Sequence, residues 1–210
     1  MFDNLSAVQL LVVFGSLLIG MTVHEAMHAF AGHWLGDSTA FEEGRLTLNP
    51  LKHIDLYTTV LLPMILILFG LPPIFAAKPV PFNPNRVRYD EFGVALVGLA
   101  GPFTNLAMAC IAGLIFRLVP IASNGISDAL VIFTLINVGL FVFNMIPFPP
   151  LDGSRLLYAF APEPLQRVMR SIEGFGFGAI LLFIFIIYQF VAPVVGAVME
   201  GILRIIVGIG

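Results

Sequence analysis

The stretch MTVHEAMHAF, residues 21–30, places two histidines and a glutamate inside a segment that is otherwise apolar. His24 and His28 are four residues apart, so on a helix they project from one face, with Glu25 about 100° around the axis from His24. This is the H-E-x-x-H spacing, in which two imidazoles bind zinc and the glutamate is a general base. Ionisable groups in an apolar helix cost on the order of 2 to 3 kcal/mol each, which indicates a functional role.

The composition is that of an integral membrane protein. Hydrophobic residues make up 59% of the 210 residues and charged residues 11%, and the mean hydropathy is +0.99. We therefore predict an all-α polytopic membrane protein in which residues 1–210 form a single membrane-embedded domain with about four to six transmembrane helices. A net charge of −3 with no block of Lys and Arg excludes nucleic acid as a partner, and the single Cys110 excludes a disulfide within the chain.

Apolar runs and helix breakers divide the chain into segments. Helices are expected at about residues 5–35, 91–119, 127–145 and 154–160, followed by a long apolar stretch from residue 172 that Pro193 interrupts. Whether residues 194–210 span the membrane stays open. A further apolar run, residues 56–69, is too short for a full crossing, and a proline-rich segment follows it up to about residue 85. We read this run as a re-entrant hairpin.

The basic residues support that topology. A re-entrant run places eight of the ten Lys and Arg residues on one side of the membrane, whereas a full crossing would divide them six against four. The eight are Arg45, Lys52, Lys78, Arg86, Arg88, Arg155, Arg167 and Arg170. We therefore expect their side to be cytoplasmic, with the N-terminus outside.

A catalytic zinc needs a third protein ligand and an open position for water. His33 lies nine residues after His24, so on a continuous helix it faces the opposite way, and the loop position of His53 is not fixed by the sequence. Asp152 follows the helix expected at residues 127–145, whose end faces the cytoplasm in the re-entrant topology, as does the end of the first helix. Asp152 is therefore the predicted third ligand.

Three motifs occur in a characteristic order: HEAMH at residues 24–28, GPFTN at 101–105 and NMIPFPPLDG at 144–153. With them the chain resembles the site-2 protease family of intramembrane zinc metalloproteases. The stretches GDSTAFEEGRLTLNPLKHID and AKPVPFNP resemble its compact members, which lack a PDZ domain.

This resemblance implies one zinc per chain, held by His24, His28 and Asp152, with Glu25 as the catalytic base. Asn105 and Asn144 would lie near the site and hold the substrate or its oxyanion, although hydrogen bonding between helices is an alternative role for Asn105. The implied reaction is peptide-bond hydrolysis in or near transmembrane segments of substrate proteins. The implied location is the cell membrane, with the active site toward the cytoplasm and the lipid bilayer around it.

Within residues 41–49, polar and apolar side chains alternate as in a β-strand, with Arg45 and Thr47 polar and Leu46 and Leu48 apolar. Such a segment could hold an unwound substrate as an added strand, and the alternative is a solvated loop.

A metal or proton transporter is the competing class, because intramembrane His, Asp and Glu also mark ion pathways. A hydrolase needs Glu25 beside a ligand histidine, and a carrier does not. The sequence leaves the oligomeric state open.

Overall fold

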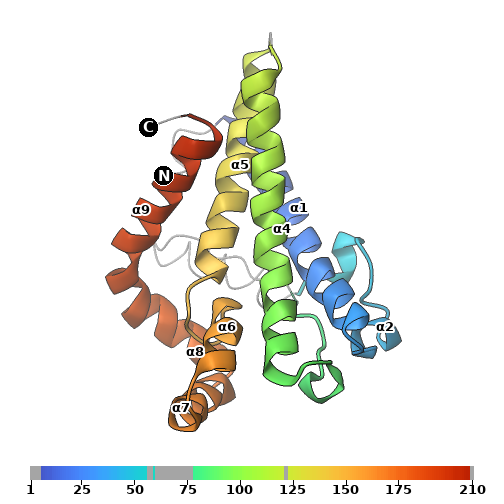
Figure 1. Cartoon of the computed structure of the whole chain (residues 1–210). Helices are drawn as coiled ribbons and strands as arrows, with labels where there is room; N and C mark the ends of the chain where they lie inside the picture. Colours follow the sequence, from blue (N-terminus) through green and yellow to red (C-terminus); the bar gives the residue numbers. More distant parts are fainter. Residues whose placement is uncertain (1–5, 56–58, 60–77, 121–122, 209–210) are drawn as a thin grey trace.

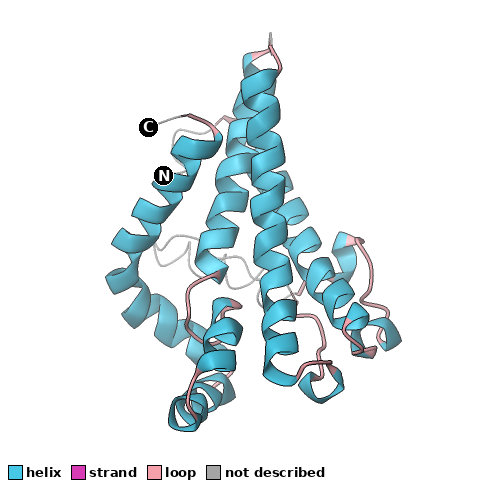
Figure 2. Ribbon diagram, in the orientation of Figure 1, coloured by secondary structure: helices cyan, strands magenta, loops and turns pink. Residues whose placement is uncertain are grey.

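The computed structural model describes residues 6–55, 59, 78–120 and 123–208, and these residues form helices joined by loops, with no strand among them (Figures 1 and 2). Four helical stretches in this part are long and apolar enough to cross a membrane. They are α1 (Ala7–Trp34), α4 (Asp90–Leu118), α5 (Asn124–Asn144) and the run Gly178–Ile206, which contains most of α8 (Phe177–Leu182), a π-helical turn (Phe183–Ile187) and α9 (Tyr188–Ile206). The prediction of an all-α polytopic membrane protein is confirmed.

The helices α1, α4 and α5 pack against one another, and α9 packs against α5 and α4. A buried apolar cluster of Ala109, Val138, Val142 and Val195 joins α4, α5 and α9. In Figure 1, α1 and α5 run toward the lower end of the molecule, where α2 (Thr39–Glu42), α6 (Gly153–Phe160) and α7 (Glu163–Gly174) also lie. Two 3₁₀ turns, η1 (Pro50–Lys52) and η3 (Pro84–Arg86), complete the described elements.

Local sequence fixes the ends of the first helix. Ser6 caps α1 by accepting a hydrogen bond from the backbone of Gln9, whose side chain in turn accepts from the backbone of Ser6. At the other end Gly36 has a φ of +110°, a conformation that glycine adopts without strain. The chain therefore leaves α1 sharply, just below the histidines.

A buried carboxylate ties the chain after α1 to the chain before α4. Asp37 is 1% exposed and accepts hydrogen bonds from the hydroxyl and backbone N–H of Thr39 and, at 2.7 Å, from the backbone N–H of Asn83. Burial by itself would raise the pKa of Asp37, but the three hydrogen bonds outweigh it and lower the pKa below its ordinary value. Asp37 therefore stays ionised and fixes the position of residues 82–83.

The run at residues 56–69, which we predicted to be re-entrant, lies outside the described residues. The described chain on either side of it meets at one end of the molecule, since the N–H of Lys78 donates to the carbonyl of His53 at 2.8 Å and that of Arg88 to Leu35 at 2.8 Å. Arg117 lies at the opposite end, where its guanidinium donates to the carbonyl of Ile205.

Two local expectations are wrong. Residues 41–49 form no strand. Residues 41–42 are the end of α2, and the buried side chain of Arg45 donates a hydrogen bond to the carbonyl of Lys78. Pro193 lies inside α9, and the long apolar stretch breaks instead near Gly176, where φ is +52°. The GPFTN motif lies in the middle of α4, with Pro102 inside the helix.

We expect cysteines introduced at Ser123 and at Asn85, each in a Cys110→Ala background, to face opposite sides of the membrane, because they lie at opposite ends of α4. By the positive-inside rule, a membrane-impermeant maleimide added to intact cells should label the Ser123 position, and the Asn85 position should react only after permeabilisation. Labelling of both positions from outside would contradict this topology.

Candidate metal centre

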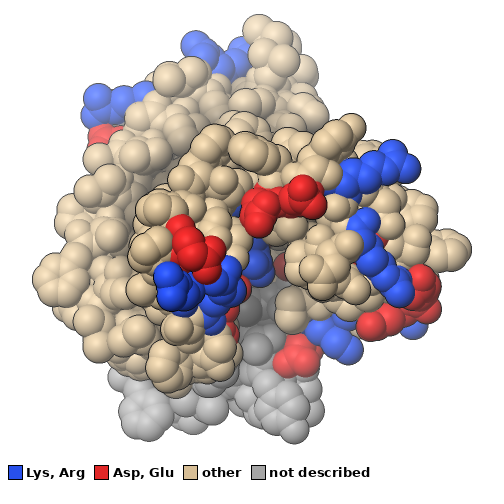
Figure 3. Space-filling view, turned by 60° about the horizontal axis from the view of Figure 1, so that its bottom comes forward, with Lys and Arg blue, Asp and Glu red and all other residues tan. Residues whose placement is uncertain are grey.

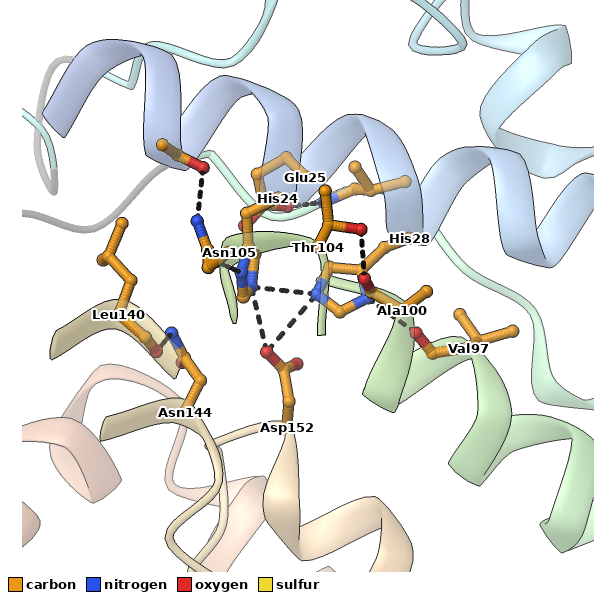
Figure 4. A network of polar contacts seen from close by, with 12 residues as sticks. His24, Glu25, His28, Val97, Ala100, Thr104, Asn105, Leu140, Asn144 and Asp152 are labelled. Carbon is orange, nitrogen blue, oxygen red and sulfur yellow. Dashed lines mark hydrogen bonds and ion pairs between the residues drawn. The ribbon is translucent and has the colours of Figure 1, made fainter. Parts of the chain in front are cut away.

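Three side chains from distant parts of the sequence converge at the lower end of α1 (Figure 4). Nε2 of His24 lies 3.0 Å from Oδ2 of Asp152 and 3.0 Å from Nε2 of His28, and the third edge, from His28 to Asp152, is 3.3 Å. Among the described residues, these three side chains form a cluster of His and Asp whose ligand atoms are close enough together to bind one metal ion. Tetrahedral zinc with bonds of about 2.0–2.2 Å has ligand atoms about 3.3–3.6 Å apart, so the triangle is within a few tenths of an ångström of the size that this ion needs.

The charge state of the ligands also favours a cation. Nδ1 of His28 lies 2.7 Å from the carbonyl of Val97, which only accepts hydrogen bonds, so Nδ1 carries a proton, and in the neutral imidazole Nε2 then presents a lone pair. Oδ2 of Asp152 lies 3.0 Å from Nε2 of His24 and 3.3 Å from Nε2 of His28, so all three ligand atoms face one small space. When both imidazoles are neutral and Asp152 is ionised, their electron pairs face one another, an arrangement that a positive ion between them would stabilise.

Two glycines let the helices approach closely enough to form this triangle. A Cβ on Gly101 in α4 would lie 2.5 Å from Nε2 of His28 and 2.7 Å from Nε2 of His24. A Cβ on Gly153 would overlap the backbone carbonyl of Met145 at the end of α5. Gly153 therefore lets α6 begin in direct contact with the end of α5, and this position directs the preceding Asp152 toward α1.

Glu25 lies beside the triangle and is half-buried. Its Oε2 accepts a hydrogen bond of 3.2 Å from the backbone N–H of Val80, and its Oε1 has no hydrogen bond to a described residue. Val80 belongs to the strap, our name for residues 79–82, an irregular segment between Lys78 and η3. The strap thus holds one carboxylate oxygen of Glu25 and leaves the other able to accept a proton.

A cavity of about 330 Å³ opens at the site. Its described lining includes the three converging side chains, Glu25, the strap, Asn144, Arg155 and, on the α8 side, Ile180, Phe183 and Ile184. Figure 3 looks toward this end and shows charged side chains on both sides of the hollow. Among the described residues, the cavity is thus lined by both polar and apolar side chains.

The other predicted residues are placed as follows. Asn144 lines the cavity and donates to Leu140 in its own helix, whereas Asn105 is fully buried and contacts His24. Residues 45–48 are not among the described residues that line the cavity, and a role for them in substrate binding stays a prediction.

The two remaining histidines lie elsewhere. His33 packs its ring against Phe41, and the buried His53 bonds the carbonyl of Thr47 at 2.8 Å. Both are apart from the triangle.

Sequence reasoning missed two residues of the site. Asn137 in α5 is fully buried and hydrogen-bonded to Asn105, and Gly101 provides the space in which the imidazoles meet. The only signal for Asn137 was a single amide in an apolar helix, which polar packing between helices explains equally well.

The fold and the site together define a polytopic membrane protein with a candidate metal centre of the H-E-x-x-H type. Residues 114–188 match the model of Peptidase family M50. Two curated relatives carry the name "Putative zinc metalloprotease": YwhC from Bacillus subtilis is 33% identical over 215 residues, 98% of this chain and 94% of the relative, and Rip2 from Mycobacterium tuberculosis is 28% identical over 195 residues, 91% and 71%. No solved structure matches the chain.

The chain therefore belongs to peptidase family M50, the zinc-dependent site-2 protease family, and is a zinc metalloprotease. Only residues 87–89 separate η3 from α4, so no PDZ domain is inserted at that point.

We expect Gly101→Ala to abolish stoichiometric zinc binding, because its methyl group would occupy the position where the two imidazoles meet. Helix propensity alone predicts that alanine stabilises the helix by up to about 1 kcal/mol relative to glycine, so a loss of zinc and of stability would come from the steric clash. Gly15→Ala in α1, where a Cβ would meet nothing within 4 Å, is the matched control. Metal analysis and thermal unfolding of the detergent-purified variants check this, and full zinc occupancy in Gly101→Ala would contradict the proposed packing.

Proposed function

We propose that this protein is an intramembrane endopeptidase that cleaves peptide bonds in or near transmembrane segments of other membrane proteins. The observation that carries the proposal is the meeting of His24, Glu25 and His28, on a helix long enough to span a membrane, with Asp152, which follows a second such helix at the start of α6. A soluble peptidase would not need to bury this group among apolar helices, where each ionisable side chain is costly.

His24, His28 and Asp152 would hold the zinc, which when bound lowers the pKa of its water toward 7 and polarises the scissile carbonyl. Glu25 takes the proton of the attacking water on Oε1 and passes it to the nitrogen of the leaving amine. The backbone N–H of Val80 holds Oε2 throughout, so the carboxylate keeps its orientation. Asn144, on the wall of the same cavity, is placed to donate to the substrate carbonyl when its side chain turns from Leu140.

The substrate must reach this centre in an extended form. A transmembrane helix hides its carbonyls in internal hydrogen bonds, so a short part of it has to unwind before attack. The cavity of about 330 Å³ is lined on one side by the strap and on the other by Asp152 and Phe183. A volume of this size accommodates a few residues of extended chain rather than a helix about 10 Å wide.

We place the active site toward the cytoplasm. Basic residues on the connections at the lower end outnumber those at the other end, and cytoplasmic loops carry the excess of Lys and Arg. Water would then enter from the cytoplasmic side through the polar hollow of Figure 3.

Metal analysis of ligand variants tests the binding site. The wild type should contain about one zinc per chain. His24→Ala, His28→Ala and Asp152→Ala should each lose most of it, because two remaining ligands hold zinc poorly. His33→Ala, on the same helix but outside the triangle, is the matched control and should keep its zinc. A comparable loss of zinc in His33→Ala would contradict the assignment of the three ligands.

Replacement of the general base tests the chemistry. Glu25→Gln keeps the shape of the side chain and leaves the three ligands in place, so zinc should remain bound. Cleavage of a reconstituted single-span substrate should fall by about 100-fold to 10,000-fold, because glutamine cannot take the proton.

Two outcomes would contradict the proposal. Glu25→Gln could cleave as fast as the wild type, or the zinc-loaded wild type could cleave none of a broad panel of single-span substrates. Zinc or proton flux into vesicles without any peptide product would indicate a transporter instead.

A further inference from the structure

Two buried asparagines connect three helices behind the metal centre. Asn105 in α4 and Asn137 in α5 are both 0% exposed, and they bond each other, the backbone of Gly20 in α1 and the ring of His24. A buried amide that lacks partners costs about 1–3 kcal/mol, so a chain of amides needs a structural or functional reason. Figure 4 shows Asn105 between the ring of His24 and the backbone of α1.

The partners of these amides fix which atom faces which. The carbonyl of Phe133 only accepts, so the side-chain atom of Asn137 that lies 2.9 Å from it is the nitrogen, and the oxygen of Asn137 faces Asn105. Asn105 meets that oxygen at 2.9 Å and the carbonyl of Gly20 at 3.1 Å, two acceptors that both require its nitrogen. The oxygen of Asn105 must therefore face His24, at 2.6 Å from Nδ1.

This direction determines the form of the imidazole. Since Asn105 presents an oxygen, Nδ1 of His24 carries a proton and donates it, and in the neutral imidazole required of a metal ligand Nε2 keeps the lone pair, which points at His28 and Asp152. Reversal of either amide would set oxygen against a backbone carbonyl.

We propose that Asn137, acting through Asn105, is a positioning residue that holds His24 in the tautomer and orientation required of a metal ligand. The inference rests on the ligand role of His24 in the proposed function. It assigns Asn105 to the histidine rather than to the substrate, since every polar atom of Asn105 already has a protein partner. Partners of this kind around metal ligands are worth about 10-fold to 100-fold in metal affinity.

The packing around Gly20 fits this role. A Cβ on Gly20 would lie 2.8 Å from Leu140 Cδ1 and 3.1 Å from the oxygen of Asn137. A larger residue at position 20 would press on Leu140 and Asn137 of α5, beside the carbonyl that accepts from Asn105 of α4. Neutral amides also suit this position, because a carboxylate deep among apolar helices would add a charge that nothing nearby compensates.

The test compares Asn137→Leu with Thr134→Val. Thr134 lies one turn earlier in α5, is also 0% exposed, and bonds only the carbonyl of Leu130 in its own helix among the described residues, so it matches Asn137 in burial but not in contact with the site. Zinc affinity is measured by competition with a chelator on the purified full chain, together with thermal unfolding of the zinc-free protein.

We expect zinc to bind about 10-fold to 100-fold more weakly to Asn137→Leu and within about twofold of wild type to Thr134→Val. Asn137→Asp, which when protonated offers the same donor and acceptor, should restore most of the affinity. Asn137→Ala, which removes the amide without adding bulk, replaces the leucine variant if that does not fold.

Wild-type zinc affinity in Asn137→Leu or Asn137→Ala would overturn the inference, and so would an equal loss in Thr134→Val, which would show a general packing defect. The result is separable from the proposed function. If the wild type binds zinc and cleaves no substrate, the proposed function fails, whereas the zinc affinities still decide the role of Asn137.

Discussion

The convergence of His24, His28 and Asp152 at one point is the constraint on which the rest of this structure depends. Asp152 follows His24 by 128 residues in the chain and yet lies in contact with it. For this contact to form, α5 must end at the same depth as the histidines of α1. Gly101 keeps α4 from filling the space between them. The order of the helices, the antiparallel course of α4 and the close start of α6 all serve this meeting of three ligand atoms.

The two histidines of the candidate metal centre are tolerated among apolar helices because Nδ1 of each has a hydrogen-bond partner. His28 has the carbonyl of Val97, and His24 has an amide chain that ends on backbone carbonyls. These partners are neutral, and among the described residues the carboxylates beside the two histidines are those of Asp152 and Glu25. A doubly charged cation would neutralise these two carboxylates, which lowers the free-energy cost of burying them in the membrane.

Most of the fold and the ligands could be predicted because their signals are local. Long apolar runs predict spanning helices, and the spacing of His24 and His28 predicts one shared face. Asp152 needed the topology as well. The partner of Asn105 could not be predicted, because the contact with Asn137 depends on how three helices pack. The alternation at residues 45–48 misled us because it reflects the burial of Arg45 under the backbone of Lys78 rather than a strand.

The distance in sequence between the ligands has a consequence for biosynthesis. A ribosome adds about 5–20 residues per second, so the 128 residues between His24 and Asp152 take roughly 6 to 26 seconds to make. During that interval the chain contains two of the three proposed metal ligands and lacks the aspartate. The proposed metal centre can therefore form only after α5 and the start of α6 have been made, so a partly synthesised chain would have no proteolytic activity.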